Sequence, residues 1–273
     1  MMVTAVTEDM DFARRFGGVA RLYGEPALAR LAAAHVCVIG IGGVGSWAAE
    51  ALARSAVGRI TLIDLDHVAE SNTNRQIHAH DGAFGKAKVL AMAERIRAIN
   101  PACVVSGIEE FVTAQNVALL LPQSGQSGVF DCVLDAIDNV RAKAALIAHC
   151  RSLDIAIVTT GGAGGRRDPT RVRVADLAHT QQDALASKLR ARLRKEYGFP
   201  RDLKKKFGID CVFSDEPIAR PESTGPACDL DEAPGVAGGA QGLNCAGYGS
   251  SVAVTATFGL VAAARVLDRL ILN

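Results

Sequence analysis

The sequence predicts an α/β protein with a doubly wound, mostly parallel sheet and a basic C-terminal elaboration. Short apolar runs alternate with amphipathic segments between residues 36 and 159, a spacing typical of parallel strands joined by crossover helices. A glycine-rich turn at residues 40–45 joins the first apolar run directly to a helix. Hydrophobic residues make up 49% of the 273 residues, so a large core is expected without disulfides.

The elements follow from hydrophobic period and from boundary residues, in chain order. Residues 12–33 are predicted to be helical, with Leu22, Leu28 and Leu31 on one apolar side. Asn100–Pro101 should end the helix expected at residues 86–99, because proline disfavours helical backbone at the residue before it. We then expect strands at 36–39, 59–63, 103–108, 130–134 and 155–159, and helices at 46–55, 86–99, 116–121 and 140–153.

After Gly161 the alternation gives way to charged and flexible sequence. We expect a strand at 170–174, a basic helix at 177–197, a charged loop at 199–207, a poorly ordered segment at 214–243 and a final helix from about Ser250. Residues 246–264 carry no charge and reach the roughly 18-residue length of a membrane span. Their glycines, serines and threonines favour a buried helix, so no stable membrane span is expected.

The cysteines do not predict a disulfide framework or a zinc ribbon, because they are odd in number and form no CxxC pair. Four lie in predicted strands and helices and are core candidates: Cys37, Cys103, Cys132 and Cys150. Cys211, Cys228 and Cys245 surround the flexible segment, where packing is favoured over a transfer role because no cation adjoins Cys245. The acidic N-terminus does not resemble a signal peptide, and we expect a cytoplasmic protein.

The glycine-rich turn predicts a nucleotide site in a Rossmann-like sheet. Its glycines, Gly40, Gly42, Gly43 and Gly45, form a GxGxxG pattern between a strand and a helix. Glycine permits a tight turn and close approach of backbone amides to phosphate, and the helix N-terminus adds partial positive charge. Asp64 ends the next strand, 19 residues after Gly45, where it can bind ribose hydroxyls. Up to this point NAD and ATP fit equally well.

The segment after Asp64 favours a triphosphate. Arg75 offers a planar fork of donors for phosphate oxygens, and Asn72 and Asn74 can bind phosphate or fix the loop. Lys86 and Lys88 follow at a predicted helix start, where the helix dipole disfavours a cation and functional use is therefore favoured.

A fourth segment, residues 135–139, follows the strand at 130–134. Ligands of open α/β sheets bind at the carboxyl ends of strands, and a carboxylate there can hold Mg²⁺. Asp138 is the candidate ligand, with Asn139 beside it. The alternative is that Asp138 only caps the helix that begins at Val140.

Together these motifs (GxGGxG, DxDxVxxSNxNRQ, GxxK and DxxDN) resemble the ubiquitin-activating-enzyme-like adenylyltransferases of molybdopterin and thiamine synthesis, over roughly residues 12–165. The resemblance implies ATP and Mg²⁺, adenylation of a carboxylate and release of pyrophosphate. At matching positions it implies that Gly43 approaches the phosphates, that Asp64 binds the ribose and that Asp138 holds magnesium. It further implies that Asn72, Arg75 and Lys88 stabilise the triphosphate, with Asn74 and Asn139 completing the nucleotide site.

The same resemblance implies a homodimer in which one subunit lends an arginine to its partner. The N-terminal segment of this sequence spaces its arginines differently from the family pattern, and Arg15 and Arg21 are both candidates.

Further stretches, among them RFGGxARLYG, SNTNRQIHA, VTTGGAGG and CVFS, resemble a tRNA-modifying branch of this family that lacks zinc-binding CxxC pairs. That branch implies ATP-dependent cyclisation of a threonylcarbamoyl group on adenosine 37 of tRNA. Two alternatives stay open. One is adenylation of the C-terminus of a ubiquitin-like sulfur carrier, and the other is a non-catalytic nucleotide-binding partner of a cysteine desulfurase and its sulfur acceptors.

The segment from residue 188 to residue 206 holds nine basic and two acidic residues in a chain whose net charge is +1. Such a segment is typical of a polyanion-binding surface or of a solvated helix face. With a tRNA substrate implied, we expect tRNA contacts from Lys188, Arg190, Arg192, Arg194, Lys204, Lys205 and Lys206.

The expected organisation is a mobile arm at residues 1–11 followed by a single adenylating domain at residues 12–273. Within it, residues 12–165 form the nucleotide-binding core, residues 166–245 the basic and flexible elaboration, and residues 246–273 the C-terminal helix.

Overall fold

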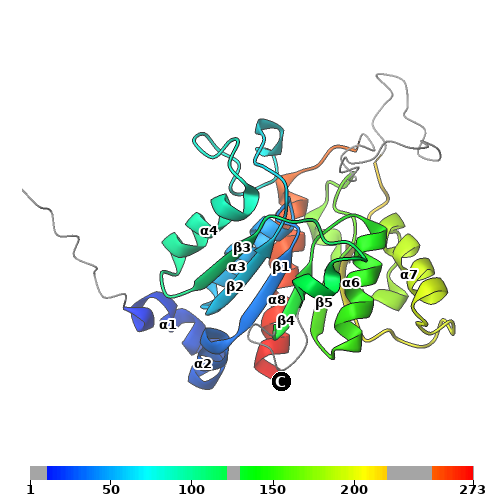
Figure 1. Ribbon diagram of the computed structural model, residues 1–273, viewed down its shortest axis with the longest axis horizontal. Helices are drawn as coiled ribbons and strands as arrows, with labels where there is room; N and C mark the ends of the chain where they lie inside the picture. The colour runs from blue at the N-terminus through cyan, green and yellow to red at the C-terminus, as the bar shows by residue number, and fades with distance from the viewer. Residues whose placement is uncertain (1–10, 122–129, 220–247, 273) are drawn as a thin grey trace, which may run out of the picture.

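A computed structural model describes residues 11–121, 130–219 and 248–272 (Figure 1). The helices are α1 Phe12–Tyr23, α2 Glu25–Ala33, α3 Gly45–Arg54, α4 Lys88–Ile99, α5 Val117–Leu120, α6 Val140–Ser152, α7 Ala184–Glu196 and α8 Val252–Leu272. Short 3-10 helices occur at η1 Glu70–Asn72, η2 Pro169–Arg171 and η3 Leu177–His179. The strands are β1 His35–Ile39, β2 Arg59–Ile63, β3 Val104–Ile108, β4 Cys132–Asp135, β5 Ala156–Thr160, β6 Val172–Asp176 and β7 Asp210–Ser214.

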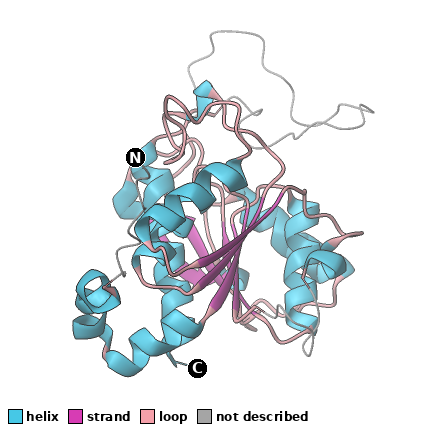
Figure 2. Cartoon of the chain, turned by 60° about the vertical axis from the view of Figure 1, so that its left-hand side comes forward, coloured by secondary structure: helices cyan, strands magenta, loops and turns pink. Residues whose placement is uncertain are grey.

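The strands form one seven-stranded sheet in the order β3-β2-β1-β4-β5-β7-β6. Every neighbouring pair is parallel except β6 and β7, which are antiparallel. Figure 2 shows the twisted sheet lying between helices on both faces. This is the doubly wound α/β fold that the sequence predicts. The strand order reverses between β1 and β4, so a crevice is expected at the carboxyl ends of these two strands.

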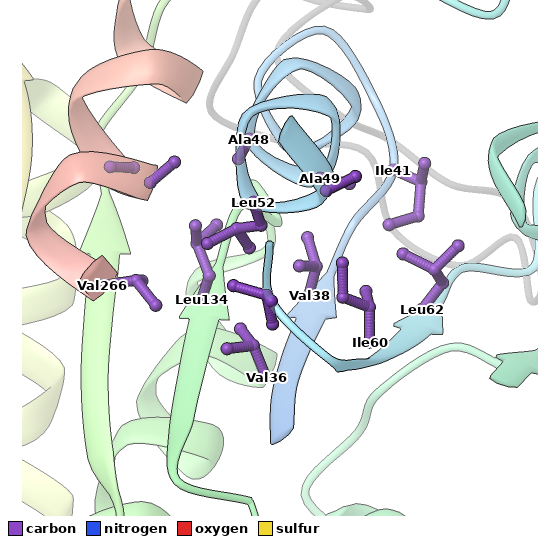
Figure 3. Close-up of a cluster of buried hydrophobic side chains, with 14 of the residues drawn as sticks. Val36, Val38, Ile41, Ala48, Ala49, Leu52, Ile60, Leu62, Leu134 and Val266 are labelled. Atoms are coloured by element: carbon purple, nitrogen blue, oxygen red, sulfur yellow. The ribbon is translucent and has the colours of Figure 1, made fainter. Parts of the chain in front are cut away.

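Alternate residues of β1 face two different cores. Val36 and Val38 belong to the core shared with α3, α4 and α8, whereas Cys37 and Ile39 belong to the core on the α6 and α7 face. The period of two follows from the pleat of a strand. Figure 3 shows Val36 and Val38 packed with side chains of the neighbouring strands and of α3. The sheet therefore has no solvated face near its centre, which fixes the strand ends that carry the site.

The N-terminal helical region is broken, whereas the sequence predicts one helix over residues 12–33. Asp11 caps α1 by accepting from the backbone N–H of Arg14 at 2.8 Å. Gly24 then takes a φ of 91°, a left-handed value that ends α1 and redirects the chain into α2. Leu28 and Leu31 are buried as expected, but Leu22 is exposed because it lies before the break.

The far edge of the sheet differs most from expectation. β7 lies between β5 and β6, at residues where no strand was predicted. The helix expected at 177–197 begins only at Ala184, because Asp183 caps it by accepting from the N–H of Ala186 at 2.8 Å. The strand expected at 170–174 is displaced to β6. The basic segment is thus attached to the main sheet through two further strands.

The apolar C-terminal stretch forms α8, which packs on the sheet and against α3. A Cβ built on Gly259 would lie 2.4 Å from the carbonyl oxygen of Val44, so only glycine allows this contact. None of the helices in the described ranges is long and apolar enough to cross a membrane. Residues 1–10 of the arm expected at residues 1–11 lie outside the described residues, whereas Asp11 is the cap of α1. Most of the segment predicted to be poorly ordered, with Cys228 and Cys245, also lies outside the described residues.

Candidate nucleotide site

The glycine turn follows β1, and its glycines meet distinct steric demands. Gly40 has a φ of +85°, and a Cβ there would lie 2.9 Å from the side chain of Ile137. A Cβ on Gly45 would lie 1.8 Å from the carbonyl oxygen of Gly40, so the helix can start against the turn only with glycine. A Cβ on Gly42 would meet nothing within 4 Å. The turn is therefore closed on the protein side and open at Gly42, where a phosphate can approach the backbone.

Asp64, just after β2, holds this turn in place by a hydrogen bond to its backbone. Its carboxylate accepts from the backbone N–H of Ile41 at 2.6 Å and from that of Asp66 at 2.8 Å. Burial raises the pKa of this carboxyl above its ordinary value, and the nearby charge of Lys88 offsets part of that rise. The residue expected to bind ribose thus also fixes the glycine turn, a role that the sequence does not reveal.

Arg75 is brought against the glycine turn by the loop that follows β2. A Cβ on Gly43 would lie 3.2 Å from Cγ of Arg75, so the arginine stem packs on the turn. The guanidinium donates to the carbonyl oxygen of Ser71 at 2.8 Å and to the side-chain oxygen of Asn74 at 2.9 Å. Burial lowers the pKa of this guanidinium. Trp47 of α3 donates to the carbonyl oxygen of Arg75 at 2.9 Å and fixes its backbone.

The two asparagines of this loop shape it. Asn72 is buried, and its side-chain oxygen accepts from the N–H of Ala69 at 3.1 Å, which closes η1. Asn74 donates to the carbonyl oxygen of Ser250 at 3.0 Å, which ties the loop to the start of α8. Of the two roles open for these residues, fixing the loop is the one that these contacts support.

Lys88 is the first residue of α4 and is buried. Its ammonium donates to the carboxylate of Asp66 at 2.6 Å. A helix N-terminus disfavours a cation, and burial removes its hydration, so Asp66 provides the compensating charge. Because Asp66 is partly exposed, an incoming phosphate could share or replace it.

The carboxyl end of β4 carries two different carboxylates. Asp135 is fully buried with Lys143 of α6 at 2.9 Å, and it also accepts from the hydroxyl of Thr159 at 2.7 Å. Asp138 is exposed and is not the cap of α6. That cap is Asn139, whose side-chain oxygen accepts from the N–H groups of Arg141 and Ala142 at 3.0 and 3.1 Å.

Sequence reasoning missed the pair formed by Lys143 and Asp135. The signal was available, since Lys143 stands between alanines on the apolar side of a predicted helix, a position that a lysine occupies only with a partner.

The site therefore gathers at the carboxyl ends of three adjacent strands, β2, β1 and β4. The glycine turn, Asp64, Arg75 and Lys88 are joined by the contacts above, and Asp138 follows Ile137, which touches Gly40. This is the position of the crevice expected from the reversal of strand order, where open α/β sheets bind nucleotides.

The two candidate arginines of α1 lie elsewhere in the chain. Arg15 donates to the carbonyl oxygen of Ile99 at 3.0 Å, at the end of α4 opposite to Lys88. The helix separates these ends by about 16 Å, at about 1.5 Å per residue. Arg21 lies over its own helix beside Gly17. Neither arginine contacts the glycine turn within one chain.

The basic residues expected to bind tRNA fall into two groups. Lys188 and residues 204–206 are exposed, and Arg192 is partly exposed and pairs with Glu196 at 3.4 Å. Arg190 instead donates to the hydroxyl of Thr180, and Arg194 donates to the carbonyl oxygen of Pro200 at 3.1 Å and stacks over Phe207. The latter two side chains thus help to hold the elaboration together.

The cysteines predicted for the core are all buried: Cys37, Cys103, Cys132 and Cys150. Cys211 is buried as well, in β7, and burial raises the pKa of its thiol. Such a thiol is a poor nucleophile, so packing is the role that its surroundings support.

Comparison with known proteins matches residues 15–272 to the ThiF family. The chain is 54% identical to the tRNA threonylcarbamoyladenosine dehydratase of Escherichia coli K12, over 94% of this chain and 93% of that protein. It is 46% identical to the Haemophilus influenzae protein of the same name, over 99% of this chain and 98% of that protein. Among solved structures, the E. coli dehydratase in complex with ATP aligns with a TM-score of 0.82 at 48% identity, covering 100% of this chain and 98% of that chain.

Proposed function

Because this chain belongs to the ThiF family, we propose that it is an ATP-dependent tRNA threonylcarbamoyladenosine dehydratase that works through an acyl-adenylate. The observation that carries the proposal is the pair of fixed cations at the glycine turn, Arg75 packed on Gly43 and Lys88 held by Asp66. A nicotinamide dinucleotide needs no such cations, whereas a triphosphate that loses pyrophosphate does.

In the first step, a carboxylate oxygen of the threonyl group attacks the α-phosphorus of ATP. The bond from that phosphorus to the bridging oxygen breaks, and pyrophosphate leaves. Backbone N–H groups at Gly42 and Gly43 approach the phosphates, and Arg75 and Lys88 neutralise charge as it moves to the leaving group. Asp64 binds the ribose, and Asn72 and Asn74 hold the loop in place.

In the second step, an atom of the neighbouring carbamoyl group attacks the activated carbonyl carbon and AMP leaves. The net change is loss of water from the substrate. Because the attacking group is already attached to the same base, its effective concentration is high. A protein nucleophile is therefore not required, which agrees with the burial of Cys211.

Magnesium fits the residues at the end of β4. Mg²⁺ binds through one or two carboxylates together with substrate phosphates, and Asp138 presents an exposed carboxylate in the crevice. The alternative role of Asp138 as helix cap is taken by Asn139. Asn139 uses its side-chain oxygen in the cap, so its contact with nucleotide is proposed through the amide nitrogen. When bound, the metal supplies charge neutralisation of the phosphates.

We propose a single adenylating domain that acts as a homodimer, in which Arg15 or Arg21 completes the site of the partner subunit. Their distance from the glycine turn within one chain supports a role across subunits and not within one. tRNA is the substrate, the cytoplasm is the compartment, and a cysteine desulfurase with its sulfur acceptors is a secondary partner.

Two further functions compete: adenylation of a ubiquitin-like sulfur carrier, and nucleotide binding without catalysis. ATP–pyrophosphate exchange separates all three. We expect exchange that depends on tRNA carrying the threonylcarbamoyl group and does not occur with a sulfur carrier. Exchange with the carrier alone would transfer the proposal to the first alternative, and no exchange with either substrate would favour the second.

Asp138→Ala tests the metal role in the same assay. We expect exchange and cyclisation to fall by at least about a thousandfold, since one ligand of the metal is lost, with an unchanged denaturation midpoint. Glu25→Ala, which removes an exposed carboxylate on α2, is the matched control and should retain wild-type exchange. Undiminished exchange in Asp138→Ala would reject the magnesium role.

A further inference from the structure

A second concave feature lies between the first turn of α6 and one side of α7, with a volume of about 420 Å³. Its walls carry four basic side chains and one carboxylate: Arg141, Lys188, Arg192, Lys195 and Glu196. We call this feature the α6–α7 groove. Figure 1 shows these two helices side by side on the part of the molecule away from α1.

Helix geometry produces the row of cations. Lys188, Arg192 and Lys195 are spaced by four and three residues, so they lie above one another on a single face of α7. A neighbouring face of α7, about a third of a turn away, carries Leu189 and Leu193, which are buried in the core below. The buried leucines anchor α7, and successive cations along it are spaced by about 5–6 Å.

The charges of the groove are poorly compensated. Arg192 pairs with Glu196 at 3.4 Å. Within the described residues, Arg141, Lys188 and Lys195 have no carboxylate partner. Closely spaced like charges raise the local potential and favour an anionic ligand.

The groove begins where the nucleotide site ends. Val140 and Arg141, which form its α6 wall, directly follow Asp138 and Asn139. An anion bound in the groove would therefore lie beside the proposed magnesium ligand. No aromatic side chain lines the groove within the described part of the chain, so base stacking is not offered there.

From this geometry we propose that the α6–α7 groove binds the phosphate backbone of the tRNA and so directs its modified base toward the nucleotide site. The proposal rests on the proposed function and identifies which cations meet the substrate. It retains Lys188 and Arg192 from the sequence-based set and adds Arg141 and Lys195. Arg190 and Arg194 are assigned to internal contacts. Glu196 weakens the groove by pairing with Arg192.

The main test is the double substitution Lys188→Glu with Lys195→Glu. Binding of a fluorescent tRNA is measured by anisotropy at several salt concentrations, together with ATP affinity by calorimetry. We expect tRNA affinity to fall about 10- to 100-fold and the dependence of log affinity on log salt to become shallower by about 0.7–0.9 per lost phosphate contact. ATP affinity should not change.

A matched control replaces two exposed arginines away from the groove, Arg30→Glu with Arg59→Glu. Arg59 begins β2 and so lies at the edge of the sheet opposite to the strand ends that carry the site. This variant changes the net charge by the same amount and should bind tRNA as the wild type does. An equal loss of affinity in both variants would show a general charge effect and overturn the assignment.

A gain-of-affinity variant makes the test independent of folding defects. Glu196→Gln removes the one carboxylate and releases Arg192, so tRNA affinity should rise about two- to fivefold at low salt. The groove assignment would be overturned if tRNA affinity were unchanged both in Glu196→Gln and in the Lys188→Glu/Lys195→Glu variant.

Other outcomes separate the groove from the function. If the wild type cyclises modified tRNA but the Lys188→Glu/Lys195→Glu variant binds tRNA normally, the groove assignment is refuted and the proposed function stands. A parallel loss of ATP affinity in the Lys188→Glu/Lys195→Glu variant would show that the groove holds the triphosphate, and would also refute the groove assignment. Displacement of bound tRNA by acidic peptide from the wild type, but not by free phosphate, would assign the groove to a protein partner. Failure of the wild type to cyclise modified tRNA would refute the proposed function.

Discussion

Two lysine–aspartate pairs flank the nucleotide crevice, and they differ in exposure. Lys143 and Asp135, at the end of β4, are both 0% exposed. Lys88 and Asp66, at the start of α4, are 7% and 44% exposed. Both pairs have short separations, 2.9 Å and 2.6 Å. The distance between the charges therefore does not distinguish the pairs, and access of solvent and ligand to the carboxylate does.

The remaining hydrogen bonds explain the difference. Lys143 also donates to the carbonyl oxygen of Ile137 at 2.8 Å, and Asp135 also accepts from Thr159. That pair is satisfied by the protein alone and connects β4, β5 and α6. Within the described part of the chain, Lys88 pairs only with Asp66, on a side that ligands can reach. The fully buried pair, Lys143 with Asp135, therefore supports the fold. The partly exposed pair, Lys88 with Asp66, which we call the open pair, is suited to exchange its carboxylate for phosphate.

The largest expected effect is on stability, from Lys143→Met. Removing one partner leaves Asp135 as an uncompensated buried charge, at a cost of about 3–5 kcal/mol. Urea denaturation measures the loss. Lys143→Met combined with Asp135→Asn should recover much of it, because the remaining charge is then gone. A single variant as stable as the wild type would remove the distinction between the two pairs.

Lys88→Met should affect catalysis more than stability. Loss of a donor that stabilises the leaving group lowers the rate of adenylation about 10²- to 10³-fold. The free energy of unfolding should fall by less than in Lys143→Met, because Asp66 is already partly hydrated. Pyrophosphate exchange and urea denaturation of the same preparation measure both. A variant that is strongly unstable but fully active would invert the comparison.

Arg75→Lys should give an intermediate effect. Lysine preserves the charge and the stem that packs on Gly43, but it loses the planar fork of donors. We expect exchange activity to fall about 10- to 100-fold with ATP affinity less affected. Full activity would mean that positive charge alone suffices at this position, as it does for Lys88 in its pair with Asp66.

The smallest expected effect is electrostatic and concerns His78. Burial, and then the charge of Lys88, lower the pKa of this imidazole from 6.5 to about 4. The folded protein therefore keeps His78 neutral where the unfolded chain binds a proton. This contribution to stability is complete above about pH 6.5 and is lost as the pH falls toward 4.

In Lys88→Met the pKa of His78 should rise, because one repelling charge is gone, and the acid-induced loss of stability should shrink by less than about 1 kcal/mol. An NMR titration of the imidazole measures the change directly. The same pKa in both proteins would show that the charge of Lys88 is screened from His78.

Much of this arrangement could be predicted from sequence where the demand is local. A glycine turn between a strand and a helix, with an aspartate after the next strand, specifies backbone geometry and its ligand within one short segment. Arg75 and Lys88 could be chosen as candidates from the segments that follow, because a triphosphate requires cations, and their contact with nucleotide stays a prediction. The identity of Asn139 as helix cap could not, since Asp138 and Asn139 are equally suitable caps.

Features set by distant contacts were not predictable. β7 is a short apolar run that becomes a strand only because β5 and β6 lie on either side of it. The burial of Lys143 depends on β4 and β5, and the internal bonds of Arg190 and Arg194 depend on the chain's path around α7. Counting charges along the sequence could not separate these arginines from Lys188, which is exposed.

The contact of α8 with the glycine turn has a consequence for how the protein folds. The hydrogen bond between Asn74 and Ser250 spans 176 residues, and Gly259 touches the backbone of Val44 across a still longer stretch. Closing such long loops is slow because entropy is lost before contacts form. The turn should therefore reach its final shape late, so that in pulse-labelled hydrogen exchange its amides gain protection after those of the central strands.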